Sequence, residues 1–136
     1  WTFHDFDAKH SDRSLLFDSH ASSICASVLT IEQGTAPNGI VVAQCVGPQF
    51  ESPSEIDALE KLGAQVVGMT LGPEQRLVSE LDTSHISLLC SSNWAAGRDP
   101  DNPNSEIDHE GVSSKASEAR KAVSKCIIEL LNRINQ

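Results

Sequence analysis

The sequence predicts an α/β fold, a mixed sheet flanked by helices. Short runs of β-branched apolar residues, at 40–43 and 66–70, have the composition of buried strands. Between and after them lie segments in which apolar residues recur every three or four positions, as on one face of a helix. Turns rich in Gly and Pro separate these segments. The expected order is helix, strand, helix, strand, helix, strand, helix, which is typical of a layered α/β domain.

Length and charge narrow the class of protein. The chain has 136 residues, which suits one domain with a real core. Its net charge of −9 argues against nucleic acid or an anionic membrane as the main partner, because both attract basic surfaces. No apolar run approaches the roughly 20 residues of a membrane span, and the polar first ten residues do not resemble a signal peptide. We therefore expect a soluble protein.

The cysteines predict a reducing environment. Cys25, Cys45, Cys90 and Cys126 are scattered and form no CxxC pair. Cys45 and Cys90 lie in apolar runs, so we expect free, buried thiols rather than a disulfide framework or a zinc site. This usage favours a cytoplasmic location and no metal.

The N-terminal third is expected to contain a loop and one helix. The first ten residues show no period and are interpreted as a loop. Ser11 or Asp12 is expected to cap a helix that ends near Thr30, with Leu15 and Ile24 on its apolar face. A turn-rich connector follows at 33–39.

The centre of the chain predicts a strand, a turn and a helix. A buried strand is expected at 39–46, ending in the sharp turn of Gly47. Ser52 can then cap a helix in which Pro53 takes the first position and Glu55 reaches back to the Ser52 amide. Gly63 is expected to close that helix, and residues 66–70 form the next strand, which ends at Met69 and Thr70.

The remainder predicts two more helices and a third strand. We expect a break at 71–74, a helix at 74–81 and a third buried strand at 85–92. A polar loop at 98–106 leads to a long amphipathic helix, capped by Asp108 and ending near Asn135. Side chains at strand ends and helix starts are where open α/β sheets place ligands.

Four motifs, in order and at matching spacing, resemble the trimeric class of the purine nucleoside phosphorylase and methylthioadenosine phosphorylase family. They are GPQFESPSE at 47–55, LGAQVVGMT at 62–70 followed by GPE at 72–74, SN at 92–93, and HEGV at 109–112. The match is good over 39–135 and looser over 1–38. The resemblance implies one domain at 1–136 that corresponds to the C-terminal half of the family's fold.

The family's reaction is phosphorolysis, in which phosphate attacks the anomeric carbon of a nucleoside and a purine leaves. By resemblance, Glu51 accepts a hydrogen bond from the N1 edge of the purine, and Phe50 packs on the base. Asn93 hydrogen-bonds the six-position oxygen and N7 of a 6-oxopurine. Asn93 and Glu51 are thus the candidate catalytic residues, since they stabilise the charge that develops on the leaving base.

The same resemblance assigns the sugar and phosphate sites. Met69 lies under the ribose as an adaptable apolar floor. Thr70 donates its hydroxyl to phosphate, and His109 hydrogen-bonds the 5′-hydroxyl of the sugar. Phosphate is the co-substrate, and no cofactor is implied.

The sequence also departs from the family. The family's chain is roughly twice as long, and its first half carries most of the phosphate ligands. Gln49 and Gly72 stand where the family has other residues. We therefore expect weak or no phosphorolysis from this chain alone, and expect self-association, as a trimer, or a second polypeptide that supplies the N-terminal half. The Trp1 start, without an initiator Met, fits a processed, split or partial chain.

Two alternatives remain open. One is a non-catalytic module that binds purines or nucleosides without turnover. The other is a 5′-methylthionucleoside phosphorylase, although His109 favours an ordinary nucleoside, because methylthio-specific members have an apolar residue there. For any one of the candidate residues a purely structural role is the commoner explanation, and only the four motifs together favour a functional one.

Overall fold

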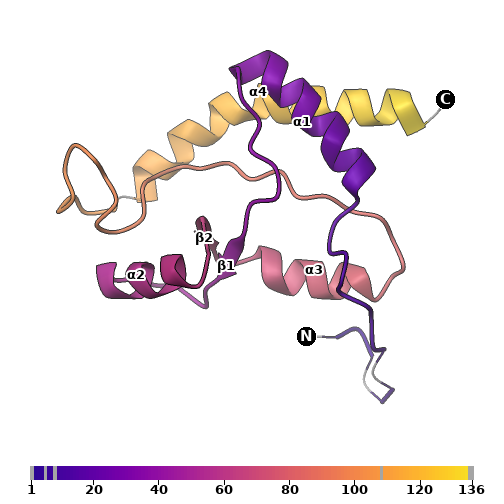
Figure 1. The fold of residues 1–136 in the computed structure, drawn as a ribbon, viewed down its shortest axis with the longest axis horizontal. Coiled ribbons are helices and arrows are strands. Elements are labelled where there is room, and N and C mark those ends of the chain that lie inside the picture. Colours follow the sequence, from indigo (N-terminus) through magenta and orange to yellow (C-terminus); the bar gives the residue numbers. More distant parts are fainter. Residues whose placement is uncertain (1, 5, 8, 108, 135–136) are drawn as a thin grey trace. The chain divides into compact units, whose positions relative to one another are not determined.

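The computed structural model describes residues 2–4, 6–7, 9–107 and 109–134, with side chains outside 109–118 and 134. The chain forms two compact units, which are described separately. The first comprises Trp1–Asn38, Thr70–Leu88 and Cys126–Gln136, and the second comprises Gly39–Met69 and Leu89–Lys125. Figure 1 labels their helices and strands.

The second unit contains a parallel strand pair joined by a helix. Strands β1 (Val42–Gln44) and β2 (Val66–Gly68) pair in parallel, with Val42 opposite Val66 (Figure 1). Helix α2 (Pro53–Lys61) forms the connection between them. Strand, helix and parallel strand confirm the predicted α/β class. Each strand is shorter than expected, and the sheet has two strands in the described residues.

The start of α2 follows the predicted capping box. The Ser52 hydroxyl accepts a hydrogen bond from the Glu55 amide at 3.4 Å, and the Glu55 carboxylate accepts one from the Ser52 amide at 2.7 Å. Pro53 takes the first helical position, where its missing N–H costs nothing. Past the other end, Gly63 has a φ of +94°, which a glycine adopts without strain. The predicted boundaries of this helix are confirmed.

The first helix begins later than predicted. Helix α1 (Ser19–Gln33) is capped by Asp18, whose side chain accepts a hydrogen bond from the Ala21 amide at 2.9 Å. The expected start at Ser11 or Asp12 was wrong. Ser11 instead contacts α3 (Leu71–Ser79), where its hydroxyl donates to the Ser79 carbonyl at 2.9 Å. This tertiary hydrogen bond outweighs the local capping signal.

Helix α3 also differs from expectation. It begins at Leu71, so the predicted break at 71–74 was wrong. Pro73 lies within its first turn, where the backbone N–H has no intrahelical acceptor and a proline is tolerated. Gln75 is the buried residue of this helix, and the Arg13 guanidinium donates to its side-chain oxygen.

The third predicted strand is absent, because residues 85–92 form no ladder with any described part of the chain. The His85 carbonyl accepts instead from the Asp18 amide at 2.9 Å, at the start of α1. An apolar run becomes a strand only when a neighbouring strand supplies its hydrogen-bond partners. The apolar composition of this segment was therefore not sufficient.

The C-terminal helix α4 (His109–Ile134) confirms the predicted long helix. The predicted cap, Asp108, lies outside the described residues. On its predicted apolar face, Val123 and Leu130 are partly buried, whereas Ile127 is 50% exposed. A search of the described helices finds none long and apolar enough to cross a membrane.

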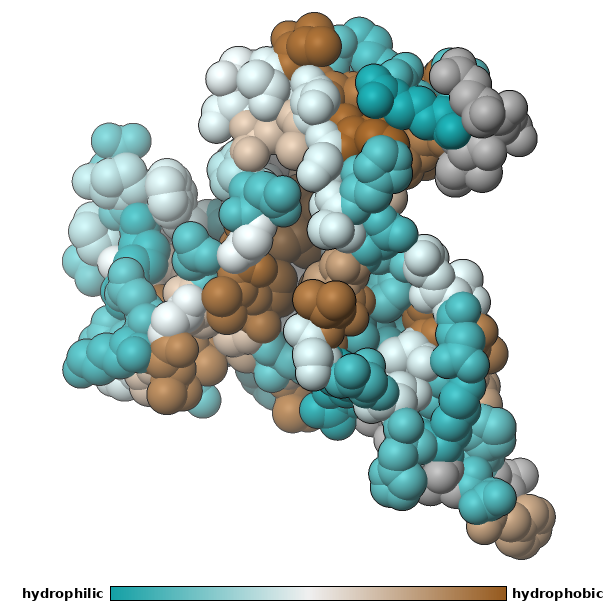
Figure 2. All heavy atoms as spheres, turned by 45° about the vertical axis from the view of Figure 1, so that its right-hand side comes forward, coloured by the Kyte–Doolittle hydropathy of each residue, from teal (hydrophilic) through white to brown (hydrophobic). Residues whose placement is uncertain are grey.

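Among the side chains that the structure describes, few are fully buried. The buried apolar ones are Ile24, Cys25 and Cys126 in the first unit and Ile56 in the second. All four cysteines are free, but Cys90 is exposed and Cys45 is only partly buried, so the expectation of buried thiols was wrong for these two. Apolar side chains also reach the surface (Figure 2), and the exposed large ones include Phe6, Leu15, Ile31, Val46, Leu62, Leu81, Trp94, Ile128 and Leu131.

Candidate functional site

The candidate site lies in the second unit, at the carboxyl ends of its two strands. There the side-chain amide of Gln44 donates from Nε2 to the Cys45 carbonyl at 2.7 Å and to the Met69 carbonyl at 2.6 Å. The Cys45 amide donates to the Gly68 carbonyl at 2.9 Å. These bonds fix the two strand ends to each other, which is where parallel sheets present ligand-binding side chains.

Met69 packs against the turn after β1. Gly47 has a φ of +66°, and a Cβ atom at this position would overlap with the sulfur of Met69. The thioether therefore occupies the space that a side chain would need, and only glycine permits both the close contact and the backbone conformation. The predicted sugar-binding residue is thus placed beside the turn that leads to Phe50 and Glu51. Met69 remains 43% exposed.

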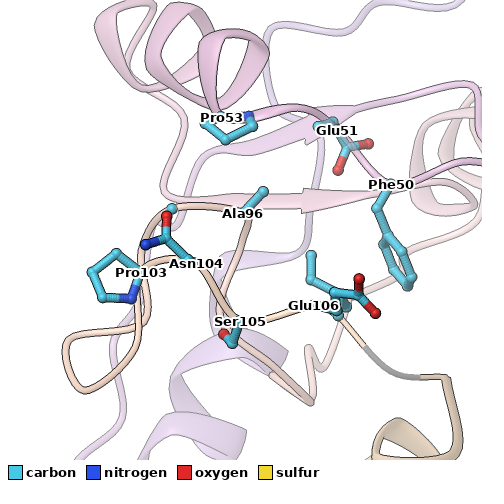
Figure 3. A pocket seen from close by; sticks show the side chains of 10 residues that line it. Phe50, Glu51, Pro53, Ala96, Pro103, Asn104, Ser105 and Glu106 are labelled. Atoms are coloured by element: carbon cyan, nitrogen blue, oxygen red, sulfur yellow. The ribbon is translucent and has the colours of Figure 1, made fainter.

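A hollow of about 540 Å³ lies beside this turn (Figure 3). One wall comes from the start of α2 and the residues before it, and the other from the loop between residues 96 and 107. The lining residues are Phe50, Glu51, Pro53, Ala96, Gly97, Pro103, Asn104, Ser105, Glu106 and Ile107. The hollow contains two of the predicted base-binding residues and has the size of a small-molecule site.

Cys45 lies near the carboxylate of Glu51. Burial, first, and the nearby carboxylate of Glu51 together raise the pKa of the Cys45 thiol to about 11. The thiol therefore stays protonated at neutral pH, and it donates to the Ala43 carbonyl at 4.0 Å. It thus adds no negative charge beside Glu51.

The opposite wall is tied to α2. The Arg98 guanidinium donates to the Asp57 carboxylate at 2.6 Å and to the Glu60 carboxylate at 2.7 Å. The pKa of Asp57 is lowered, mainly by its hydrogen bond from Arg98. Next to Arg98, Gly97 lies against Pro53, since a Cβ on Gly97 would meet the Pro53 ring at 3.4 Å. The two walls are thus held together by two ion pairs and by close packing.

The hollow is acidic. Glu51 and Glu106 are the charged residues among the described residues that line it. Because no described lining residue is cationic, the hollow disfavours an anion such as phosphate and favours a neutral ligand that donates hydrogen bonds. Sequence reasoning missed Glu106. The available signal was an acidic residue in the polar loop between the SN and HEGV motifs.

Asn93 is not among the residues that line the hollow. Its side-chain oxygen accepts from the Ser92 hydroxyl at 2.8 Å, and its amide nitrogen donates to the Trp94 carbonyl at 2.9 Å. The structure thus brings together Phe50 and Glu51 in the hollow and Met69 beside their turn, and it leaves the Asn93 amide engaged with its neighbours.

Of the two remaining predicted residues, Thr70 is described in full and His109 only in its backbone. Thr70 belongs to the first unit, where it precedes α3, is exposed and makes no side-chain capping bond. His109 is the first residue of α4, but its side chain lies outside the described ones. In the described residues no group of three His, Cys, Asp or Glu side chains could hold a metal ion.

The fold is that of a nucleoside phosphorylase. The chain is similar to the Q289L mutant of adenosine/methylthioadenosine phosphorylase from Schistosoma mansoni, solved in complex with tubercidin, with a TM-score of 0.79. That similarity covers 98% of this chain and 54% of the other at 16% identity, so it concerns the fold alone. The chain belongs to the phosphorylase superfamily, whose family model matches residues 3–132. The family expected from the four motifs is confirmed.

Relatives with known names share part of the sequence. The chain is 37% identical over 93 residues to a probable S-methyl-5′-thioinosine phosphorylase from Methanopyrus kandleri, covering 68% of this chain and 36% of that protein. It is 40% identical over 81 residues to a probable 6-oxopurine nucleoside phosphorylase from Thermococcus kodakarensis, covering 60% and 30%. Purine nucleoside phosphorylase 1 of Bacillus subtilis is 30% identical over 93 residues, covering 68% and 34%. The matched region spans about a third of the length of these relatives.

Proposed function

We propose that this chain forms the purine- and sugar-binding part of a phosphorylase that cleaves 6-oxopurine nucleosides with phosphate. The products would be the free base and a sugar 1-phosphate. The observation that carries the proposal is the hollow in which Phe50 and Glu51 meet at the end of a strand, beside Met69. Membership of the superfamily and the names of the relatives support the class of reaction.

In this proposal the hollow binds the base. The ring of Phe50 offers a flat apolar face, and the carboxylate of Glu51 accepts the N1–H of a 6-oxopurine. Adenine has an acceptor at N1, so a carboxylate there repels it. Asn93 would donate to the six-position oxygen, which requires its amide to exchange the local bond to the Trp94 carbonyl for one to the base.

Phosphate would be held elsewhere. The acidic lining of the hollow disfavours it, and Thr70 is the one candidate ligand from the motifs. Thr70 lies at the start of α3, where the helix dipole favours an anion. We propose that the remaining phosphate ligands come from another polypeptide segment of the same superfamily, which would also pair with the open strand edges and cover exposed apolar residues. Self-association as a trimer and the absence of a cofactor stay predictions.

Base recognition can be measured without turnover. Calorimetry with inosine and adenosine should show inosine bound at least about tenfold more tightly, because Glu51 accepts from one and repels the other. A Glu51→Gln variant, which can also donate, should bring the two affinities within about threefold. Equal affinities for the unmodified chain would refute this assignment of Glu51.

Turnover separates the proposal from its non-catalytic alternative. We expect the chain alone, with inosine and phosphate, to release little or no hypoxanthine. Activity should appear when the N-terminal part of a relative such as the Thermococcus protein is co-expressed with it. A folded complex that binds inosine and stays inactive would favour a non-catalytic nucleoside-binding module.

A methylthionucleoside substrate is the second candidate, and it is favoured by the names of two relatives, from Methanopyrus kandleri and Methanothermobacter thermautotrophicus. His109 decides between the candidates in our proposal, because an imidazole can hydrogen-bond a 5′-hydroxyl and an apolar residue suits a methylthio group. A His109→Val variant of the completed enzyme should raise the rate on 5′-methylthioinosine relative to inosine. An unchanged ratio would count against the role of His109.

A further inference from the structure

Two glutamine side chains join the strands of the second unit at opposite ends. Just before the strands begin, the side-chain oxygen of Gln65 accepts a hydrogen bond from the Val41 amide at 3.1 Å. At the carboxyl ends, Nε2 of Gln44 donates to the Cys45 carbonyl at 2.7 Å and to the Met69 carbonyl at 2.6 Å. Of these two glutamines, Gln44 is the one that bonds a residue of the candidate site, because Met69 is the predicted floor of the sugar site.

Met69 lies just past the end of the strand ladder. Strand β2 ends at Gly68, whose carbonyl accepts from the Cys45 amide at 2.9 Å. In the described chain the ladder ends there, and the bond from Gln44 holds the Met69 carbonyl in its place. By fixing this peptide group, Gln44 fixes the direction in which the Met69 side chain leaves the backbone.

The side chain of Met69 depends on such local contacts. It is 43% exposed, so packing in a core does not set its position, and a thioether side chain bends freely. Its sulfur occupies the space that a Cβ atom on Gly47 would need. The backbone of Met69 is thus held by Gln44, and its thioether lies against the turn after β1. A shift of the Met69 carbonyl would displace the thioether from that turn.

The chemistry of an amide fixes the orientation of the Gln44 side chain. Its NH₂ group carries two hydrogens, and two carbonyl oxygens lie within hydrogen-bond distance of the nitrogen. If the amide were turned over, its own oxygen would face these two carbonyls, which are also acceptors and would repel it. The side chain therefore acts as a double donor, a role that a methionine of similar length cannot fill.

We propose that Gln44 is a positioning residue for the sugar of the substrate, and that it acts through Met69. This inference rests on the proposed function, in which Met69 lies under the ribose. Gln44 is not among the described residues that line the hollow for the base, whereas Phe50 and Glu51 are. Its effect should therefore be confined to ligands that carry a sugar, and the affinity for a free base should not depend on it.

The test compares inosine with hypoxanthine, which lacks the ribose. Calorimetry on the 136-residue chain should show inosine bound about tenfold more tightly, since inosine alone reaches Met69. Gln44→Met removes both donors, so it should reduce this ratio to about threefold and leave the affinity for hypoxanthine unchanged. Gln44→Lys, whose ammonium group can donate to both carbonyls, should restore most of the ratio.

Gln65→Met is the matched control, because it removes a bond between a glutamine side chain and the backbone at the other end of the same strands. It should lower the urea midpoint of unfolding as Gln44→Met does, but it should keep the full ratio of inosine to hypoxanthine affinity. A ratio that survives in Gln44→Met, or that falls equally in Gln65→Met, would overturn the role of Gln44 and leave the proposed function intact. Equal affinities for inosine and hypoxanthine in the unmodified chain would refute the proposed sugar site, and with it this inference.

Discussion

The sulfur of Met69 occupies the space in which a side chain of Gly47 would lie. This contact joins the end of β2 to the turn after β1, and Gln44 reinforces it by donating to the Met69 carbonyl at 2.6 Å. Glycine in the GPQF motif is therefore explained by packing: it lets the proposed floor of the sugar site approach the turn that carries Phe50 and Glu51.

Replacing Gly47 should test this contact. In Gly47→Ala the new methyl group overlaps with the Met69 thioether, and the φ of +66° is unfavourable for alanine. We expect the free energy of unfolding to fall by about 2–4 kcal/mol, the sum of overpacking and backbone strain. Urea unfolding followed by circular dichroism measures this change.

Gly39→Ala is the matched control for Gly47→Ala. Gly39 belongs to the same unit and has a φ of +71°, but nothing lies within 4 Å of a Cβ placed there. In Gly39→Ala the free energy of unfolding should fall only by the cost of the backbone strain, about 1–2 kcal/mol. Equal losses in the two variants would show that the contact with Met69 has no energetic consequence. A Met69→Ala change in the Gly47→Ala background should recover part of the loss.

The ion pairs of Arg98 should support ligand binding. Arg98→Gln removes the bonds to Asp57 and Glu60 that join the two walls of the hollow. We expect the affinity for inosine to fall about threefold, a modest effect because exposed ion pairs contribute little. Salt should weaken binding by the unmodified chain and leave the variant nearly unaffected. Arg76→Gln is the control, because it removes a positive charge in the first unit. An equal loss of inosine affinity in both variants would contradict the role of the Arg98 ion pairs.

The carboxylates of α2 predict a loss of stability in acid. The pKa of Glu55 lies below its usual 4.5, chiefly because it accepts from the Ser52 amide, and that of Asp57 lies below 3.8, chiefly because of Arg98. A lowered pKa means that the folded state binds protons less readily than the unfolded state, so both groups stabilise the fold above these values. Stability should fall as the pH drops below about 4.5. Urea unfolding at neutral pH and at about pH 3.5 measures this loss, and it should be smaller in Glu55→Gln than in the unmodified chain. An equal loss of stability in the two proteins would contradict the contribution of the capping box.

Cys45 should be unreactive although it is partly exposed. Its pKa of about 11, raised by burial and by Glu51, leaves little thiolate at neutral pH. Iodoacetamide should label Cys45 about tenfold more slowly than the exposed Cys90, as measured by mass spectrometry of the peptides. Glu51→Gln should accelerate labelling of Cys45, whereas equal rates in the unmodified chain would argue against the contact with Glu51.

Much of the second unit could be predicted from the sequence, because its signals are local. Ser52, Pro53 and Glu55 specify the start of α2 through interactions within four residues. The β-branched runs likewise predicted both strands, although the structure shortens each of them. The motif at 47–55 also placed Phe50 and Glu51 after the end of the first strand. The structure shows in addition that both residues line the same hollow.

The predictions that were wrong concern segments whose structure depends on contacts with residues far away in the sequence. Ser11 does not cap a helix, because its hydroxyl donates to the Ser79 carbonyl, 68 residues away. Residues 85–92 have strand composition but no ladder partner in the described chain, and composition alone cannot supply one. Glu106 was missed for the same reason, because only the fold brings the loop that carries it to the hollow that Glu51 also lines.

The most direct test of the central claim is calorimetric binding of hypoxanthine to the purified chain, with and without phosphate. The claim is that these residues hold the base site and only a small part of the phosphate site. We therefore predict that a folded sample binds hypoxanthine with an affinity that phosphate leaves unchanged. Binding that tightens with phosphate would show a phosphate site that the described residues do not account for. No binding by a well-folded chain would contradict the account and leave only the fold.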